Sequence, residues 1–175
     1  MRRVFCKLIF FALIIGALAA AGEENANGTF PRIRDWDSVR IQLIRTACYG
    51  TCPDYTVTIY GNGNVEFDGH AFVGSPGEHR ARIPREKVKE LVAEFEKAGY
   101  FYLQDRYSAP VTDAPTYVTC IAFDDRKKCV IDYEGTLAGM PKSVRDLGNA
   151  IDRVADTARW IGSRQAPSRQ APSSR

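Results

Sequence analysis

The chain has 175 residues, of which 45% are hydrophobic and 26% are charged, and its formal net charge is +3. The first 21 residues hold three of the 24 basic residues and none of the 21 acidic ones, which leaves 21 of each sign in the remainder. A nearly neutral chain lacks the basic surface of nucleic-acid-binding proteins, so we exclude nucleic acid as a partner. The length suits one ordinary globular domain.

The N-terminus has the three parts of a secretory signal peptide. A basic segment ending at Lys7 precedes an apolar run over residues 8–18, and small residues follow up to Ala21. A helix that spans a membrane needs about 20 apolar residues, and this run is shorter. We therefore expect cleavage after Ala21 and a mature protein that is periplasmic or secreted, with no stable membrane span.

Composition divides the chain into four segments. Residues 1–21 are the signal peptide, 22–37 are expected to form a mobile polar arm, 38–162 form a single domain, and 163–175 form a disordered tail. The tail repeats Ser-Arg-Gln-Ala-Pro and has nothing apolar to bury beyond alanine, which is typical of segments that do not fold.

The first half of the domain has the alternating pattern of half-buried strands. Apolar residues alternate with polar ones over 39–43, 55–59 and 65–67, and each run predicts a strand. The Asn-Gly pair at 62–63 favours a tight antiparallel hairpin between the second and third strands. Residues 71–83 predict a further irregular hairpin.

Two amphipathic helices are predicted over 84–98 and 141–161, because apolar residues recur three and four positions apart. Strands over 117–123 and 129–133 lie between these helices. Strands and helices that occur in separate runs indicate an α+β domain. We expect an antiparallel sheet of about five to six strands, with the two helices packed on one face.

Four cysteines remain after removal of the leader, and an even number in an exported chain favours two disulfides. A two-residue turn at 124–125 places Cys120 opposite Cys129 at a non-hydrogen-bonded site, where α-carbons are about 4.5 Å apart. A four-residue loop would also align this pair, at the wider hydrogen-bonded spacing. Cys48 and Cys52 flank Gly50, and a turn there brings them within disulfide range.

Two other roles of the cysteines stay open. Four thiolates suffice for a tetrahedral zinc site, although only the spacing of Cys48 and Cys52 is typical of one. That pair could instead be a redox-active dithiol, although such pairs are usually Cys-x-x-Cys at a helix N-terminus, and here a strand follows. The alternative to a disulfide-stabilised domain is therefore a thiol-redox or metal-dependent enzyme that uses Cys48 and Cys52.

The remaining polar and aromatic groups form no recognisable catalytic set. His70 and His79 are expected to be surface-loop residues, and no serine lies in a nucleophile elbow. Asp113 lies in a polar loop, where an Asx-type turn is the main expectation for its carboxylate and ligand binding the alternative. Tyr107 and the aromatic residues 100–102 either line a groove or, as is more common after a core-facing helix, are buried.

One part of the sequence resembles a known family. The motif Cys48-Tyr-Gly-Thr-Cys52-Pro53-x-Tyr55, an amphipathic helix and Thr112-Asp113-x-Pro115-Thr116 before a strand are similar to the bacterial domain of unknown function 6438, over about residues 38–160. The resemblance implies an exported or envelope-associated α+β domain and implies no reaction. It extends to Cys48, Gly50, Cys52, Pro53, Tyr55, Asp113, Pro115 and Thr116, whereas the bridge between Cys120 and Cys129 rests on strand register alone.

These observations together predict a non-catalytic, disulfide-stabilised domain that uses no cofactor or metal. Its expected partner is an envelope protein, a peptide or a glycan. The candidate binding residues come from the Cys48–Tyr55 turn and the loop over 107–116, and they are Tyr49, Gly50, Tyr55, Tyr107, Asp113 and Thr116.

Overall fold

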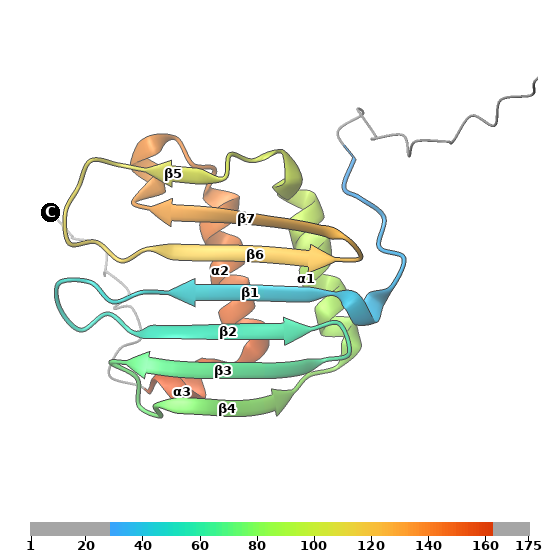
Figure 1. Cartoon of the computed structure of the whole chain (residues 1–175), viewed down its shortest axis with the longest axis horizontal. Coiled ribbons are helices and arrows are strands. Elements are labelled where there is room, and N and C mark those ends of the chain that lie inside the picture. The colour runs from blue at the N-terminus through green and yellow to red at the C-terminus, as the bar shows by residue number, and fades with distance from the viewer. Residues whose placement is uncertain (1–28, 163–175) are drawn as a thin grey trace, which may run out of the picture.

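The structure is a computed structural model that describes residues 29–162. The expected signal peptide and tail lie outside these residues. A single sheet of seven strands, in the order β4-β3-β2-β1-β6-β7-β5, forms the front layer in Figure 1. The strands are β1 (Arg40–Arg45), β2 (Asp54–Tyr60), β3 (Asn64–Ala71), β4 (Gly77–Arg82), β5 (Arg106–Ser108), β6 (Tyr117–Phe123) and β7 (Arg126–Tyr133).

The α+β class is confirmed, whereas the predicted sheet of five to six antiparallel strands is wrong in two respects. The sheet has seven strands, and it is mixed because β5 pairs with β7 in parallel. All other neighbours are antiparallel. Strand β5 has only three residues, which is too short for an alternating pattern to reveal it.

Helices cover one face of the sheet and lie behind it in Figure 1. They are α1 (Arg85–Lys97), α2 (Lys142–Ala155) and the short α3 (Ala158–Ile161), accompanied by three 3-10 turns, η1 (Trp36–Ser38), η2 (Tyr100–Tyr102) and η3 (Gly135–Ala138). The predicted helix over 84–98 is confirmed, and it ends where Gly99 adopts a left-handed φ of 59°. No helix in residues 29–162 has the length and apolar content needed to cross a bilayer.

The predicted second helix is interrupted at Asp156, which has a φ of 53°. The hydroxyl of Thr157 donates to the Asp152 carboxylate at 2.9 Å, and the Thr157 N–H donates to the Asp152 carbonyl at 3.1 Å. These bonds turn the chain, so that the Trp160 ring stacks on Phe67 with centroids 4.9 Å apart. Tertiary contacts therefore divide a segment that its apolar spacing alone predicts as one helix.

The main core lies between the helices and the sheet. Alternate residues of the central strands point to the helices and are fully buried, among them Ile41, Leu43, Val57, Ile59 and Ile121. They pack against apolar residues of α1 and α2, including Val88, Leu91, Phe95, Leu147 and Ile151. No helix formed by residues 29–162 covers the opposite face of the sheet in Figure 1. This is the alternating pattern from which the strands were predicted.

The hairpin of β6 and β7 has the predicted register. Phe123 pairs with Arg126 across a two-residue turn, and Cys120 is directly opposite Cys129. The α-carbons of these cysteines are 4.1 Å apart, and their sulfur atoms form a disulfide. The register argument, based on turn length, is confirmed.

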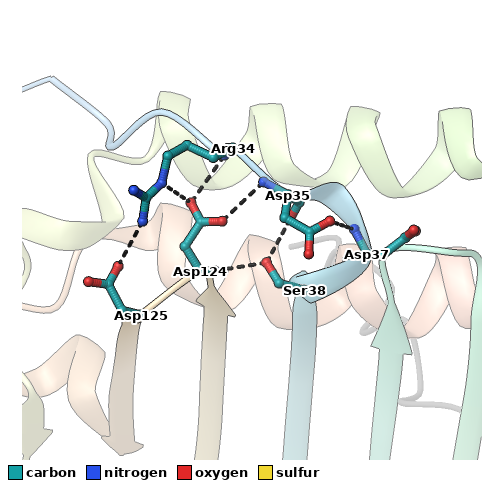
Figure 2. Close-up of polar contacts among 6 residues, drawn as sticks. All are labelled: Arg34, Asp35, Asp37, Ser38, Asp124 and Asp125. Carbon is teal, nitrogen blue, oxygen red and sulfur yellow. Dashed lines mark hydrogen bonds and ion pairs between the residues drawn. The ribbon is translucent and has the colours of Figure 1, made fainter.

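The segment before β1 is attached to the same hairpin turn, as Figure 2 shows. Asp124 accepts hydrogen bonds from the backbone N–H groups of Arg34 (3.1 Å) and Asp35 (3.0 Å), and its own N–H donates to the Ser38 hydroxyl (2.8 Å). Phe30 also packs against Phe123, with ring centroids 5.7 Å apart. From residue 29 onward, the arm that we expected to be mobile is therefore packed on the domain.

Candidate functional site

Two loops lie side by side at the left end of the sheet in Figure 1. One, residues 46–53, connects β1 to β2, and the other, residues 109–116, connects β5 to β6. We call them the loop pair. The sequence analysis points to both loops. Most of the first family motif, residues 48–55, lies in the first loop, and the second motif, residues 112–116, lies in the second loop.

The first loop is closed by a disulfide between Cys48 and Cys52, whose α-carbons are 5.5 Å apart. Gly50, at the turn, has a φ of 148°, a conformation that side chains rarely adopt. The side chain of Tyr49 projects beside it and is 89% exposed. The loop therefore presents an aromatic ring on a covalently closed turn.

Backbone hydrogen bonds join the two loops to each other. The Tyr49 N–H donates to the carbonyl of Asp113 at 3.1 Å, and the Thr46 N–H donates to the carbonyl of Thr116 at 3.0 Å. The Thr116 N–H in turn donates to the Thr46 hydroxyl at 2.9 Å. The position of Tyr49 is thus set by the second loop as well as by the disulfide.

The structure brings together some of the predicted binding residues and buries others. Tyr49, Gly50 and Asp113 are exposed on the loop pair, and Thr116 is half-buried between the loops. Tyr55 and Tyr107 are core residues, 1% and 7% exposed, so they do not belong to this surface. The expected Asx-type turn at Asp113 is not seen: its carbonyl accepts the Tyr49 N–H, and within residues 29–162 its carboxylate accepts no hydrogen bond.

Beneath the loop pair lies a polar network that the sequence reasoning missed. The Tyr55 hydroxyl donates to Asp152 at 2.7 Å, and the Arg45 guanidinium donates to the other oxygen of this carboxylate at 2.6 Å and 3.0 Å. Burial is the largest single influence and lowers the pKa of Arg45, but the charge and hydrogen bond of Asp152, together with Tyr55 and Tyr117, outweigh it, and the net pKa is raised. Burial, reinforced by Asp152, raises the pKa of the Tyr55 hydroxyl, so the phenol stays protonated.

A signal for this network was present in the strand pattern. Arg45 continues the inward-facing series Ile41 and Leu43, and Asp132 continues the inward phase of Val130. A charge in the buried phase of a strand requires a buried partner, because an unpaired charge is costly to desolvate. The partners, Asp152 for Arg45 and Arg145 for Asp132, come from α2, and nothing in the sequence indicated them.

A second polar group adjoins the first loop on the uncovered face of the sheet. His70 lies between two carboxylates, with Nδ1 2.9 Å from Asp54 and Nε2 3.3 Å from Asp68. The hydrogen bond with Asp54 is the main cause that raises the pKa of His70. The second oxygen of Asp54 accepts the Ala47 N–H at 3.3 Å, which links this group to the start of the loop.

The expectation that both histidines lie in surface loops is wrong. His70 belongs to β3, and His79 belongs to β4, where its ring is half-buried 6.0 Å from the Trp160 ring centroid. Within residues 29–162, no three His, Cys, Asp or Glu side chains are placed to hold a metal ion. The four cysteines form two separate pairs rather than one cluster.

Fold and site together define an α+β domain with one mixed sheet, two disulfides and a cross-linked pair of loops at one end of the sheet. The chain belongs to the family described as a domain of unknown function (DUF6438), whose sequence profile matches residues 39–155. No curated protein matches the chain.

Proposed function

We propose that the protein is an exported, non-catalytic binding module of the bacterial envelope, and that the loop pair is its binding surface. The observation that carries this proposal is the exposed ring of Tyr49, 89% accessible, on a loop closed by a disulfide and bonded to its neighbour. Aromatic side chains on rigid loops bind with little loss of conformational entropy. The partner is an envelope protein, a peptide or a glycan.

A binding assay with matched variants tests this surface. The purified, disulfide-bonded protein is immobilised and exposed to envelope proteins, peptides and glycans. We expect Tyr49→Ala and Asp113→Ala to reduce retention of the partner at least about tenfold, as is common when a central aromatic contact is removed. Both side chains are exposed, so neither change is expected to unfold the protein.

Tyr102→Ala is the matched control, because Tyr102 is 55% exposed and lies away from the loop pair. Its hydroxyl donates to the carbonyl of Thr29, in the segment before β1, whereas the first loop follows β1. We expect this variant to retain the partner as the wild type does. If Tyr49→Ala and Asp113→Ala also bind normally, the loop pair is not the binding surface.

A further inference from the structure

A small cavity lies between the sheet and α2, next to the loop pair. Its volume is about 10 Å³, which is room for about one water-sized group. The side chains of β1 and β6 form its floor, and α2 passes over it. The lining residues are Leu43, Arg45, Tyr117, Thr119, Asp132, Val144, Arg145 and Gly148.

Two arginines line this cavity, and each is held in place by a carboxylate. Arg45 binds Asp152 through Nε and Nη2, and Arg145 binds Asp132 through the same two atoms, at 3.2 Å and 2.9 Å to one oxygen. In neither case does Nη1 donate to a residue within 29–162. Arg45 Nη2 also donates to Asn149 at 3.2 Å. Each guanidinium is therefore held through Nε and Nη2, and the N–H donors of Nη1 are the ones that remain available.

The ring of Tyr117 lies near both guanidinium groups. Its centroid is 4.6 Å from the Cζ of Arg45 and 6.0 Å from the Cζ of Arg145. The side chain of Arg45 is 17% exposed and that of Arg145 is 33% exposed, so a ligand can reach both from solvent. The ring thus holds two cations close together at the mouth of the cavity.

The cavity also contains a polar group that lacks a partner. Thr119 is 3% exposed, and its hydroxyl makes no hydrogen bond with any residue of the described chain. A Cβ added to Gly148 would lie 3.9 Å from this hydroxyl oxygen, 3.9 Å from Arg45 Nη2 and 3.6 Å from Leu43 Cδ1. The hydroxyl is therefore aimed at the space that the glycine leaves open, and a buried hydroxyl without a partner is costly.

We propose that this cavity binds a carboxylate group. The Nη1 groups of Arg45 and Arg145 offer N–H donors to a planar anion, and the Thr119 hydroxyl offers a further donor to the oxygen that enters deepest. The cavity has room for one oxygen of the ligand, so the rest of the carboxylate lies at its mouth beside the two guanidinium groups. Asp152 and Asp132 already neutralise both arginines, so a singly charged carboxylate costs less to bring here than a doubly charged phosphate. The sources are a small free carboxylate or the carboxyl group of a bound peptide.

The position of the cavity favours the peptide source, and this part rests on the proposed function. Arg45 directly precedes Thr46, and Tyr117 directly follows Thr116, and hydrogen bonds between Thr46 and Thr116 help to join the loop pair. A peptide bound on the loop pair thus has a carboxylate site within a few residues of its contacts.

Titration of the purified, disulfide-bonded protein with sodium acetate at constant ionic strength tests the site. The readout is the NMR signal of the arginine Nε–Hε groups. We expect saturable shifts for Arg45 and Arg145 in the millimolar range, and no competition by chloride. An absent or non-saturable response, or an equal response to chloride, overturns the proposal.

Two variants test the lining without removing an ion pair. Gly148→Ala places a methyl group in the cavity at ordinary contact distances, and alanine favours the interior of a helix. Thr119→Val removes the unpartnered hydroxyl and keeps the shape. We expect both variants to melt no lower than the wild type and to bind acetate at least tenfold more weakly. Folded variants that bind acetate normally overturn the proposal.

A short alanine peptide with a free C-terminus, compared with its amide, distinguishes the two sources. We expect the free acid to displace acetate, the amide to fail, and Tyr49→Ala to weaken the peptide without changing acetate binding. If acetate binds and neither peptide does, the ligand is a small free carboxylate and the link to the loop pair is overturned. If acetate itself does not bind, the cavity proposal fails whatever the loop pair does.

Discussion

At the scale of single residues, two tyrosines of one motif lie in opposite environments. Tyr49 and Tyr55 belong to the same motif, yet the first is 89% exposed and the second 1% exposed. Tyr55 binds Asp152, which also binds Arg45 and Thr157. The motif therefore combines a surface residue with an anchor that ties the sheet to α2.

Replacement of Tyr55 by Phe tests the anchor. The change leaves the ring in the core and removes a hydrogen bond to a charged group, so we expect a loss of about 1.5 to 3 kcal/mol in the free energy of unfolding. Urea denaturation measures it. Tyr60→Phe is the control, because its hydroxyl binds Glu66 at the surface, and we expect a loss below about 0.5 kcal/mol. Equal losses in both variants would argue against the buried network.

The group around His70 predicts a pH dependence of stability. Its pKa is raised, mainly by the hydrogen bond with Asp54, so the protonated ring stabilises the folded state. The contribution is complete below the unfolded pKa of about 6.5 and is lost as the pH rises through the raised pKa. The side chain is 45% exposed, and solvent screening keeps the effect below about 1 kcal/mol.

We therefore expect His70→Ala to melt below the wild type near pH 5 and to approach it near pH 8.5. Thermal denaturation at both pH values measures the difference, and an NMR titration of the His70 ring reports the pKa directly. A gap between the variants that widens with rising pH would be opposite in sign to this prediction.

At the scale of secondary-structure elements, a hairpin turn also anchors the N-terminal segment. Asp124 has a φ of 51° and accepts the N–H groups of Arg34 and Asp35, as Figure 2 shows. The N–H of Arg34 is the main cause that lowers the pKa of Asp124. Asp124 therefore forms part of the hairpin turn, and its carboxylate also accepts the backbone N–H groups of a segment about 90 residues away in sequence.

Asp124→Gly tests this attachment, because glycine accepts the positive φ and only the carboxylate is lost. We expect faster hydrogen exchange at the Arg34 and Asp35 amides and little change in the β6–β7 hairpin. Asp125→Ala is the control: its carboxylate is 82% exposed, and its one ion pair among residues 29–162 is with the Arg34 side chain, at 3.5 Å. Unchanged exchange at these amides in Asp124→Gly would show that packing alone holds the segment.

At the scale of the whole molecule, the two disulfides agree with export but leave it as a prediction. The predicted cleavage after Ala21 would remove Cys6 and leave four cysteines, all of which are paired in the structure. Oxidising compartments are where such pairs persist. The two alternatives differ in what they expect of Cys48 and Cys52. A structural disulfide stays closed, whereas a redox enzyme requires readily reactive thiols at these positions.

Intact mass and thiol titration of the purified protein decide between these alternatives. We expect a chain that begins at Gly22, a mass lower by four hydrogens than the reduced chain, and no titratable thiol under denaturing, non-reducing conditions. Two readily titrated thiols would favour the redox alternative. A retained leader would overturn the predicted export.

The sequence by itself determined the features that depend on local chemistry. Alternation identified β1, β2 and β3, and helical spacing identified α1 and the stretch that contains α2, whereas β4 was expected only as part of an irregular hairpin over 71–83. The turn at 124–125 predicted the pairing of Cys120 with Cys129. Such features depend on neighbouring residues, whose spacing is visible in the chain.

Only the tertiary structure decided the features that join distant segments. The parallel pairing of β5, the break of the second helix at Asp156, and the partners of Arg45 and Arg145 depend on contacts between residues far apart. The same holds for the contact of Tyr49 with Asp113, 64 positions away by their residue numbers. A charged residue at a buried strand position indicates that a partner of opposite charge is needed. Which residue this partner is depends on the folded chain, because many carboxylates in the sequence could pair with the same arginine.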